Sequence, residues 1–390
     1  MTSSTVPPST VPPSEGQGGF GDRGAKKEFP CETCGAKLVF SIGAQKLKCE
    51  HCGTEKELTF AEGARVDERD LMSALDKQTG QRIGAAGAHF VGTHEVTCSA
   101  CGASVAFSGS LTSSACSYCG APIQRDKAHE LTHRLPVDGV CPFAVEKNVA
   151  DDKLKGWVRS RWFAPNEFTR RGVQGKFDGV YMPFFTFDAM TFTRYRGQRG
   201  DTYWESVGSG KNRRRVAKIR WSPASGSFQR FFDDVCIPAL KSLPQKLLHG
   251  LEPWPTERLV PFTDQALAGK LAHTYEIELG AGFQLGKERI EGELTSDVKR
   301  RIGGDVQQIS SQETSYSALT YKHVLLPVWI LAYRYGGKPY RVVVNAVTGQ
   351  VNGERPWSPI KIGIAVFFGI VVAIILAVLF GGGQDGGGGY

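Results

Sequence analysis

Eight of the ten cysteines form four Cys-x-x-Cys pairs, and the pairs are arranged twice in the same pattern. In each copy fourteen residues separate the two pairs, and the second copy lies 67 residues after the first. Two intervening residues let both sulfurs of a pair face one ion, so two pairs supply the four thiolates of a tetrahedral zinc site. The expected ligands are Cys31, Cys34, Cys49 and Cys52 in the first copy, and Cys98, Cys101, Cys116 and Cys119 in the second.

The two copies also agree outside their cysteines. Ala36 matches Ala103 and Phe40 matches Phe107 at the same offset, and a glycine follows every pair, at Gly35, Gly53, Gly102 and Gly120. Glycine lets the chain turn back with its amides facing the thiolates. We therefore expect two zinc ribbons that arose by duplication, with two Zn²⁺ per chain. The alternative, a disulfide framework, is typical of secreted chains, and no secretory signal opens this sequence.

A site closed by four thiolates stabilises a fold and leaves no position for an activated water. Other catalytic patterns are missing from the sequence. Glycine-rich stretches before Lys176 and Lys211 lack the spacing and hydroxyl of a phosphate-binding loop, and there is no G-x-S-x-G or H-E-x-x-H pattern. Isolated Cys141 and Cys236 are typical of small core residues. His94 is not needed as a ligand beside four cysteines, and no catalytic residue is predicted.

A basic cluster provides a candidate site for nucleic acid. Its residues are Lys211, Arg213, Arg214 and Arg215, and the aromatic residues Tyr203, Trp204 and Trp221 lie near it in the sequence. Arginine binds phosphate in a bidentate manner, and aromatic rings stack on bases. Two alternatives stay open, a solvated face beside a buried aromatic core and contact with anionic lipid. The net charge of +8 is compatible with all three.

Length and composition indicate a globular protein of two or three domains, since 41% of its 390 residues are apolar and 22% are charged. The predicted fold class is α+β, with two small zinc-ribbon modules, a mixed α+β globular domain and one C-terminal transmembrane helix. The predicted boundaries are a disordered Pro/Ser/Gly arm at 1–28, zinc ribbons at 29–56 and 96–124, a helical linker at 57–95, the α+β domain at 125–358, the membrane helix at 359–380 and a Gly-rich tail at 381–390.

Within the α+β domain, aromatic and β-branched runs predict strands at 179–195, 213–232, 323–335 and 340–345, the second with a turn at 221–226. Helical spacing predicts helices after Cys141 and over most of 238–302. One of these begins at a Thr263 cap and runs through Leu271. Another presents the apolar stripe Ile290, Leu294, Val298 and Ile302. Paired Asp233 and Asp234 could form an acid and base pair, but they are expected at a strand end or a helix start, since Cys236, Ile237 and Pro238 follow almost directly.

Residues 362–380, which begin with Ile362 and end with Phe380, contain no charge and no proline. A membrane span needs about twenty apolar residues, so this segment predicts a single-pass anchor in the lipid bilayer, with a buried core helix as the alternative. Arg355 and Lys361 precede the segment, and no Lys or Arg follows it. The positive-inside rule then places the bulk of the chain in the cytoplasm, tail-anchored at the inner membrane.

Five motifs carry a resemblance to a known family. They are residues 157–165 (WVRSRWFAP), 179–189 (GVYMPFFTFDA), 303–305 (GGD), 322–335 (KHVLLPVWILAYRY) and 344–349 (VNAVTG). Together with the cysteine pairs they resemble a bacterial family of membrane-anchored double zinc-ribbon proteins, over most of residues 29–360. Such proteins are often labelled as relatives of the primosomal protein N-prime helicase or as transcription-factor-IIB-type zinc-ribbon proteins. The resemblance implies two zinc ribbons and a membrane anchor, and the helicase label implies a hydrolase.

These features favour a zinc-binding, tail-anchored scaffold or adaptor that presents its cytoplasmic ribbons and α+β domain to a protein partner. One alternative is a membrane-associated nucleic-acid-binding protein that uses the basic cluster. The other is a helicase-like enzyme or another hydrolase, as the family label implies.

Overall fold

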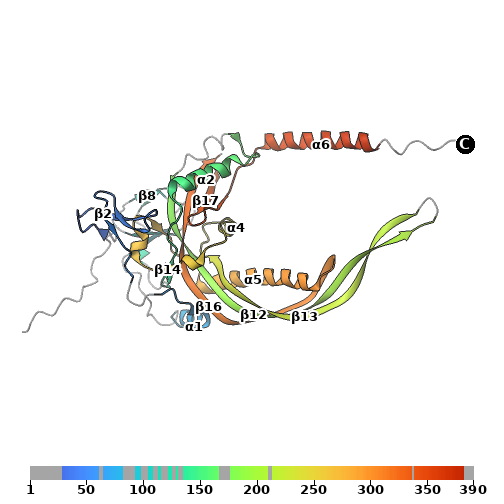
Figure 1. Ribbon diagram of the computed structural model, residues 1–390, viewed down its shortest axis with the longest axis horizontal. Coiled ribbons are helices and arrows are strands. Elements are labelled where there is room, and N and C mark those ends of the chain that lie inside the picture. Colours follow the sequence, from blue (N-terminus) through green and yellow to red (C-terminus); the bar gives the residue numbers. More distant parts are fainter. Residues whose placement is uncertain are drawn as a thin grey trace, which may run out of the picture.

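The computed structural model describes residues 29–60, 65–81, 93–97, 104–108, 113–115, 122–124, 129–130, 135–166, 176–209, 213–335 and 338–381 (Figure 1). Its architecture is α+β, as predicted. A nine-stranded sheet with packed helices forms the body, a four-stranded cysteine module lies against it, and an apolar helix extends from it. The predicted arm at 1–28 and the tail from 382 onward lie outside the described residues.

Three long antiparallel strands dominate the sheet: β12 (Lys176–Val207), β13 (Arg214–Pro238) and β16 (Val306–Tyr335), with β12 in the middle. The turn predicted at 221–226 is wrong, because these residues pair continuously with β12 from Trp221 opposite Gly200 to Gly226 opposite Tyr195. A proline is compatible with this arrangement because β13 is an edge strand, the position within sheets where proline is tolerated.

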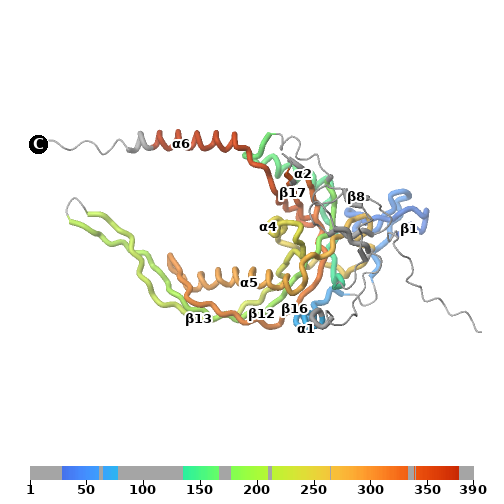
Figure 2. Tube along the Cα trace, turned by 180° about the vertical axis from the view of Figure 1, so that it is seen from behind, coloured from blue at the N-terminus to red at the C-terminus, as the bar shows by residue number. Residues whose placement is uncertain are grey.

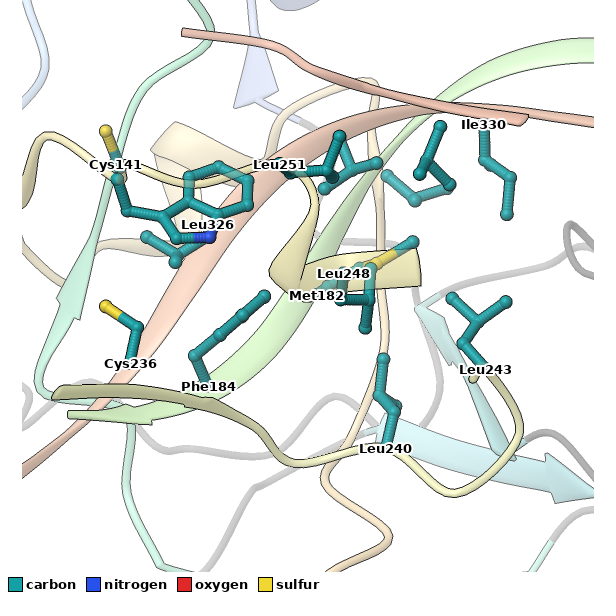
Figure 3. Close-up of a cluster of buried hydrophobic side chains, with 14 of the residues drawn as sticks. Cys141, Met182, Phe184, Cys236, Leu240, Leu243, Leu248, Leu251, Leu326 and Ile330 are labelled. Carbon is teal, nitrogen blue, oxygen red and sulfur yellow. The ribbon is translucent and has the colours of Figure 1, made fainter. Parts of the chain in front are cut away.

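Successive side chains of a strand point to opposite faces of the sheet, so β12 contributes to cores on both faces, and its Phe177 and Tyr181 join a third cluster with α2 (Lys147–Arg159). Met182 and Phe184 belong to one core, which also contains α4 (Gln245–His249) and the loop after it. Figure 3 shows this cluster, in which Cys141 and Cys236 lie among leucine, methionine and phenylalanine side chains. Both cysteines are buried, as expected for small core residues. Phe185 and Phe187 belong to the second core.

Helix α5 (Leu279–Ile302) covers the second core and lies along the curved sheet (Figure 1). The predicted apolar stripe is confirmed, because Ile290, Leu294, Val298 and Ile302 are all buried. Near the start of the helix two glycines allow a close approach to the sheet. A Cβ on Gly282 would lie 3.0 Å from the ring of Phe185, and one on Gly286 would lie 3.1 Å from the ring of Phe187.

The helix predicted from Thr263 through Leu271 is wrong. The chain forms only the short 3-10 helix η4 (Asp264–Leu267) and then the strand β15 (Leu271–Ala272), which pairs in parallel with β12. Gly269 has a φ of +76° between these elements, a conformation that ends a right-handed helix. Similarly, α2 (Lys147–Arg159) begins later than expected, because β11 (Gly139–Val140) joins the sheet beside β16 first.

The segment predicted as a helical linker contains a helix, α1 (Leu71–Gln81), but it also belongs to the body. Strand β5 (Arg69–Asp70) pairs with β16, and the side chain of Leu71 is fully buried in the core under α5. The remaining elements of the body are η3 (Thr256–Arg258), β14 (Val260–Pro261), β17 (Lys338–Asn345) and β18 (Val351–Gly353).

Strands β12 and β13 continue beyond the end of the sheet as a two-stranded arm. The pairing of β12 with β16 ends at Gly200 opposite Val306, whereas its pairing with β13 continues to Val207 opposite Arg214. Figures 1 and 2 show this arm extending away from the body on the same side as helix α6 (Pro359–Gly381). The arm, defined by residues 201–207 and 214–220, therefore carries its side chains beyond the reach of α5.

Candidate metal centre

Four short strands position the first group of cysteines. They are β1 (Phe29–Pro30), β2 (Lys37–Ser41), β3 (Lys46–Cys49) and β4 (Glu55–Lys56), joined in this order into one antiparallel sheet. The first Cys-x-x-Cys turn connects β1 to β2, and the second connects β3 to β4. Since β2 pairs with β3, with Leu38 opposite Cys49, the two turns are brought together at one end of this cysteine module.

Both Cys-x-x-Cys turns end in a backbone conformation that favours glycine. The amide of Gly35 donates to the carbonyl of Cys31 at 2.8 Å, and the amide of Gly53 donates to the carbonyl of Cys49 at 2.9 Å. The two glycines have φ values of +70° and +77°, which L side chains rarely adopt. The two turns, which have similar sequences, therefore also have the same backbone conformation.

The four sulfurs converge. The Sγ atoms of Cys31, Cys34, Cys49 and Cys52 all lie within 4.8 Å of one another. The sulfurs of Cys31 and Cys52 are 3.5 Å apart, and so are those of Cys34 and Cys49. Zn–S bonds of about 2.3 Å would place the sulfurs of a tetrahedral site about 3.8 Å apart. These four side chains could hold a metal ion with little rearrangement.

The thiols influence one another's ionisation. Burial raises the pKa of the Cys31 thiol, but hydrogen bonds, among them those from the backbone at Thr33 and Cys34, outweigh it and lower the value to about 6. A backbone hydrogen bond from Ala36 lowers the pKa of the Cys34 thiol, whereas neighbouring thiols and burial raise it to about 12. Sulfurs this close repel one another when all are ionised, so a full set of four thiolates requires a cation among them.

The module is packed against the body. Its own small core contains Leu38 and Leu47, and Ala268 of the body joins this core. The amide of Phe40 donates to the carbonyl of Ala268 at 3.2 Å, and the side chain of Phe40 belongs to the core formed by β12, β16 and α2. Gln45 adds a side-chain hydrogen bond to the carbonyl of Phe143 at 2.8 Å. The site is therefore attached to the body through both backbone and side chains.

The second group, Cys98, Cys101, Cys116 and Cys119, lies outside the described residues, but strands near it repeat those of the first. Adding 67 to the pairs Phe29–Leu38 and Pro30–Lys37 gives the register observed between β6 (Thr93–Thr97) and β7 (Ser104–Ser108). Adding 67 to the β3–β4 pairs gives the register between β8 (Ser113–Ala115) and β9 (Pro122–Gln124). Strand β10 (His129–Glu130) pairs with β6, with Glu130 opposite His94.

A buried charged cluster lies elsewhere in the body, and the sequence did not predict it. Lys322 Nζ lies 2.8 Å from Asp234 Oδ1, 3.3 Å from Glu68 Oε1 and 3.8 Å from Asp188 Oδ2. The expected strand end at Asp233 and Asp234 is wrong, because both residues lie within β13. Asp234 instead occupies an irregularity with a φ of +47°, and its amide donates to the carboxylate of Asp188.

Burial raises the pKa of Asp188 to about 6, although the Asp234 amide and Lys322 act in the opposite direction. Burial would lower the pKa of Lys322, but its ion pairs, chiefly with Asp234, outweigh burial and raise it. Lys322 and Asp234 therefore form a structural ion pair within the body, whereas burial disfavours the ionised form of Asp188. Single charged residues within the apolar runs FFTFDAM and KHVLLP were the only signal of this cluster in the sequence.

The candidate nucleic-acid residues are at the end of the arm. Arg213, Arg214 and Arg215 are exposed there, whereas Lys211 lies outside the described residues. The side chain of Trp204 is 62% exposed and that of Trp221 is 41% exposed. Three of the four basic residues therefore lie at the tip of the arm, away from the cysteine module, with Trp221 at the base of the arm and Trp204 between the tip and the base.

No family model matches the chain, and no solved structure matches it. The chain is similar to the uncharacterized protein YdjG of Bacillus subtilis (strain 168). The two are 25% identical over 276 residues, which cover 69% of this chain and 77% of the relative. The name of this relative states no activity, so the comparison carries no function to this chain.

Proposed function

We propose that this protein is a zinc-stabilised adaptor, tail-anchored at the inner membrane by α6, which holds its body in the cytoplasm for a protein partner. The observation that carries the proposal is the combination of a closed four-sulfur site with an exposed apolar helix. Four sulfurs within 4.8 Å leave no coordination position for a substrate. The 18 residues Pro359–Leu376 of α6 are apolar enough to cross a membrane, and none of that window is buried.

Zinc is proposed because four thiolates with a tetrahedral arrangement are its usual structural ligands in a reducing compartment. A second zinc ion is proposed at Cys98, Cys101, Cys116 and Cys119, supported by the strand register that repeats 67 residues after the first module. In both sites the metal would fasten two turns of the chain. The module at Cys31 would in addition brace the loop around Ala268 in the body.

Metal analysis and membrane fractionation test the two halves of the proposal separately. The purified full-length chain should contain two zinc ions, and one or none would contradict the two-site proposal. In cells, the chain should remain in the membrane pellet after alkaline carbonate washing. Ile370→Lys with Ile374→Lys should release it, because each lysine at the centre of a span costs about 2.5 to 3.5 kcal/mol.

The matched control is Val207→Lys with Val306→Lys. These two valines are 41% and 40% exposed but lie outside α6. The control chain should stay in the pellet. Release of the control, or retention of the Ile370→Lys and Ile374→Lys chain, would contradict anchoring by α6.

We keep nucleic-acid binding as a second candidate because exposed Arg215, opposite Ser206, lies on the arm near exposed Trp204, which is opposite Ala217. Binding of single-stranded DNA or RNA should weaken steeply with salt, with a slope that reflects the number of phosphates contacted. Arg214→Gln with Arg215→Gln should reduce that slope by about 1.4, since each phosphate contact on a single strand contributes about 0.7. A control change of Lys241→Gln with Lys299→Gln should leave it unchanged, and the absence of salt-sensitive binding would eliminate this candidate.

A further inference from the structure

Helix α6 starts from a fixed point on the body. The amide of Ser358, one residue before the helix, donates to the carbonyl of Phe163 at 2.8 Å. In the first turn, Lys361 Nζ donates to the carbonyl of Ala164 at 2.9 Å. Ser358 and Ala164 are both buried. The start of α6 is therefore fastened to the loop at 160–165 that follows α2, and is not a free tether.

Aromatic side chains surround this point. Trp162 and Trp357 are each 58% exposed, among the most exposed large apolar side chains outside α6. Phe163 lies between them, with ring centroids 4.8 Å from Trp162 and 6.2 Å from Trp357. Two tryptophans held open to solvent beside an apolar helix have the arrangement typical of a membrane–water interface, where one end of the indole is apolar and the other is hydrated.

Cations accompany the aromatic rings. The guanidinium of Arg355 lies 4.3 Å from the ring of Trp357, and that of Arg161 lies 4.7 Å from the ring of Trp157. Neither arginine nor Lys361 forms an ion pair with a carboxylate among the described residues. The Nε atom of Arg161 is buried and has no hydrogen-bond partner there. This surface therefore carries positive charge that the body does not neutralise.

We propose that Arg161, Trp162, Arg355, Trp357 and Lys361 form a collar that binds the headgroups of anionic phospholipids where α6 enters the bilayer. This inference rests on the proposed anchoring by α6. A lipid occupant is favoured because the collar is continuous with a helix whose apolar window is entirely exposed, and because its charge complements phosphate. Binding there would fix the depth of the body at the membrane surface.

The test uses the full-length chain in dodecyl maltoside micelles and two brominated lipids, dibromo-phosphatidylglycerol and dibromo-phosphatidylcholine, which quench nearby tryptophans. The anionic lipid should quench at the lower concentration. Arg355→Gln with Lys361→Gln should raise the midpoint for the anionic lipid by roughly 25-fold, about fivefold for each cation, and leave the zwitterionic lipid unchanged. Arg355→Lys with Lys361→Arg should retain the wild-type midpoint, because it keeps both charges.

Two sets of control variants test whether the effects depend on the collar residues themselves. Lys241→Gln with Lys299→Gln removes two exposed cations from other elements and should change neither midpoint. Trp162→Phe and Trp357→Phe should each reduce the amplitude of quenching, whereas Trp254→Phe, a change at a buried core residue, should not. Equal midpoints for the two lipids, or an unchanged midpoint in Arg355→Gln with Lys361→Gln, would overturn the collar.

Failure of the anchoring proposal would look different. If the wild-type chain does not partition into vesicles of either lipid, α6 is not an anchor and the collar has no membrane to bind. If the wild-type chain and Arg355→Gln with Lys361→Gln both partition equally into phosphatidylcholine vesicles with and without phosphatidylglycerol, only the collar is overturned.

Discussion

At the scale of single residues, the body and the cysteine module each contain a cluster of ionisable side chains. The two clusters differ in whether they contain their own cation. The sulfurs of the cysteine module could hold a cation from outside the chain, which would offset the repulsion among four adjacent thiolates. The cluster around Lys322 contains its own cation and three carboxylates, of which Asp188 is 2% exposed at its side chain. One group is therefore a candidate ligand site, and the other is part of the folded core.

The first prediction concerns the metal ligands. Cys49→Ser should reduce the zinc content by about one ion per chain, because a serine hydroxyl does not replace a thiolate in a structural zinc site. Metal analysis of the purified chain measures the change. Cys141→Ala is the matched control, since Cys141 is equally buried but lies in the core cluster of the body. An unchanged zinc content in Cys49→Ser would contradict the assignment of this site.

The second prediction concerns pH. Burial raises the pKa of Asp188 from 3.8 to about 6, so the folded state binds this proton more tightly than the unfolded state. Ionised Asp188 therefore destabilises the fold above pH 6, and stability from this group is gained as the pH falls from 7 towards 4. Asp188→Asn should remove that gain, which is about 1.4 kcal/mol between pH 7 and pH 5, since pH 5 lies one unit below the folded pKa.

Urea unfolding at pH 7 and pH 5 measures this effect as the difference in pH dependence between Asp188→Asn and the wild type. Glu68 and Asp234 titrate with lowered pKa values, so their contributions are lost only at lower pH. The same pH dependence in both proteins would show that Asp188 is not the group responsible.

At the scale of elements, α5 and the long strands form one unit. The helix buries its apolar stripe against β12, β13 and β16, and its first half packs through glycines on Phe185 and Phe187. The turn after α5 is joined to the base of the arm, because the amide of Thr202 donates to Asp305 Oδ2 at 2.7 Å and the amide of Asp305 donates to the carbonyl of Gly200 at 2.9 Å. Helix α5 and the turn after it therefore pack against β12, β13 and β16 along much of the length of these strands.

The third prediction tests the close approach of α5 to the sheet. Gly286→Leu should destabilise the body by roughly 1 to 3 kcal/mol, because even a Cβ there would lie 3.1 Å from the ring of Phe187. Gly292→Ala, on the same helix, is the matched control. No atom lies within 4 Å of its added Cβ, so the gain in helix propensity should stabilise the protein by up to about 1 kcal/mol. Equal effects of the two changes in urea unfolding would contradict this packing.

At the scale of the whole molecule, α6 and the arm extend on the same side of the body (Figure 1). Across the arm Glu205 forms an ion pair with Lys218, and Arg220 lies 5.2 Å from the ring of Tyr203. Such charges are costly in hydrocarbon, so insertion of α6 requires the arm to turn away from the direction of the helix and stay at the polar surface. The body and the arm would then both face the compartment on the collar side.

The fourth prediction concerns the orientation of the chain. The positive-inside rule applied to Arg355 and Lys361 predicts that the body lies in the cytoplasm. Trypsin added to intact spheroplasts should leave the body uncut, and the same trypsin should digest it after lysis. A periplasmic protein digested in both samples serves as the control. Cleavage of the body in intact spheroplasts would contradict this orientation.

The sequence by itself was sufficient for the features that depend on local spacing. These features are repeated or periodic patterns that span short stretches of sequence. They are the cysteine pairs with their glycines, the apolar stripe of α5 and the apolar run of α6. Converging sulfurs, a buried helix face and a long apolar run each depend on local spacing and need no knowledge of distant residues.

Only the tertiary structure decided the features that depend on partners far apart in the chain. Residues 221–226 have the composition of a turn but lie within a strand, because β12 provides a partner for every one of them. The short β15 replaces a predicted helix because Val180 of β12 lies beside Leu271. The cluster of Lys322 with Glu68, Asp188 and Asp234 and the collar at the start of α6 likewise join segments separated by many residues. Pairing and burial between distant segments outweigh local propensity, and spacing along the chain does not reveal which segments will meet.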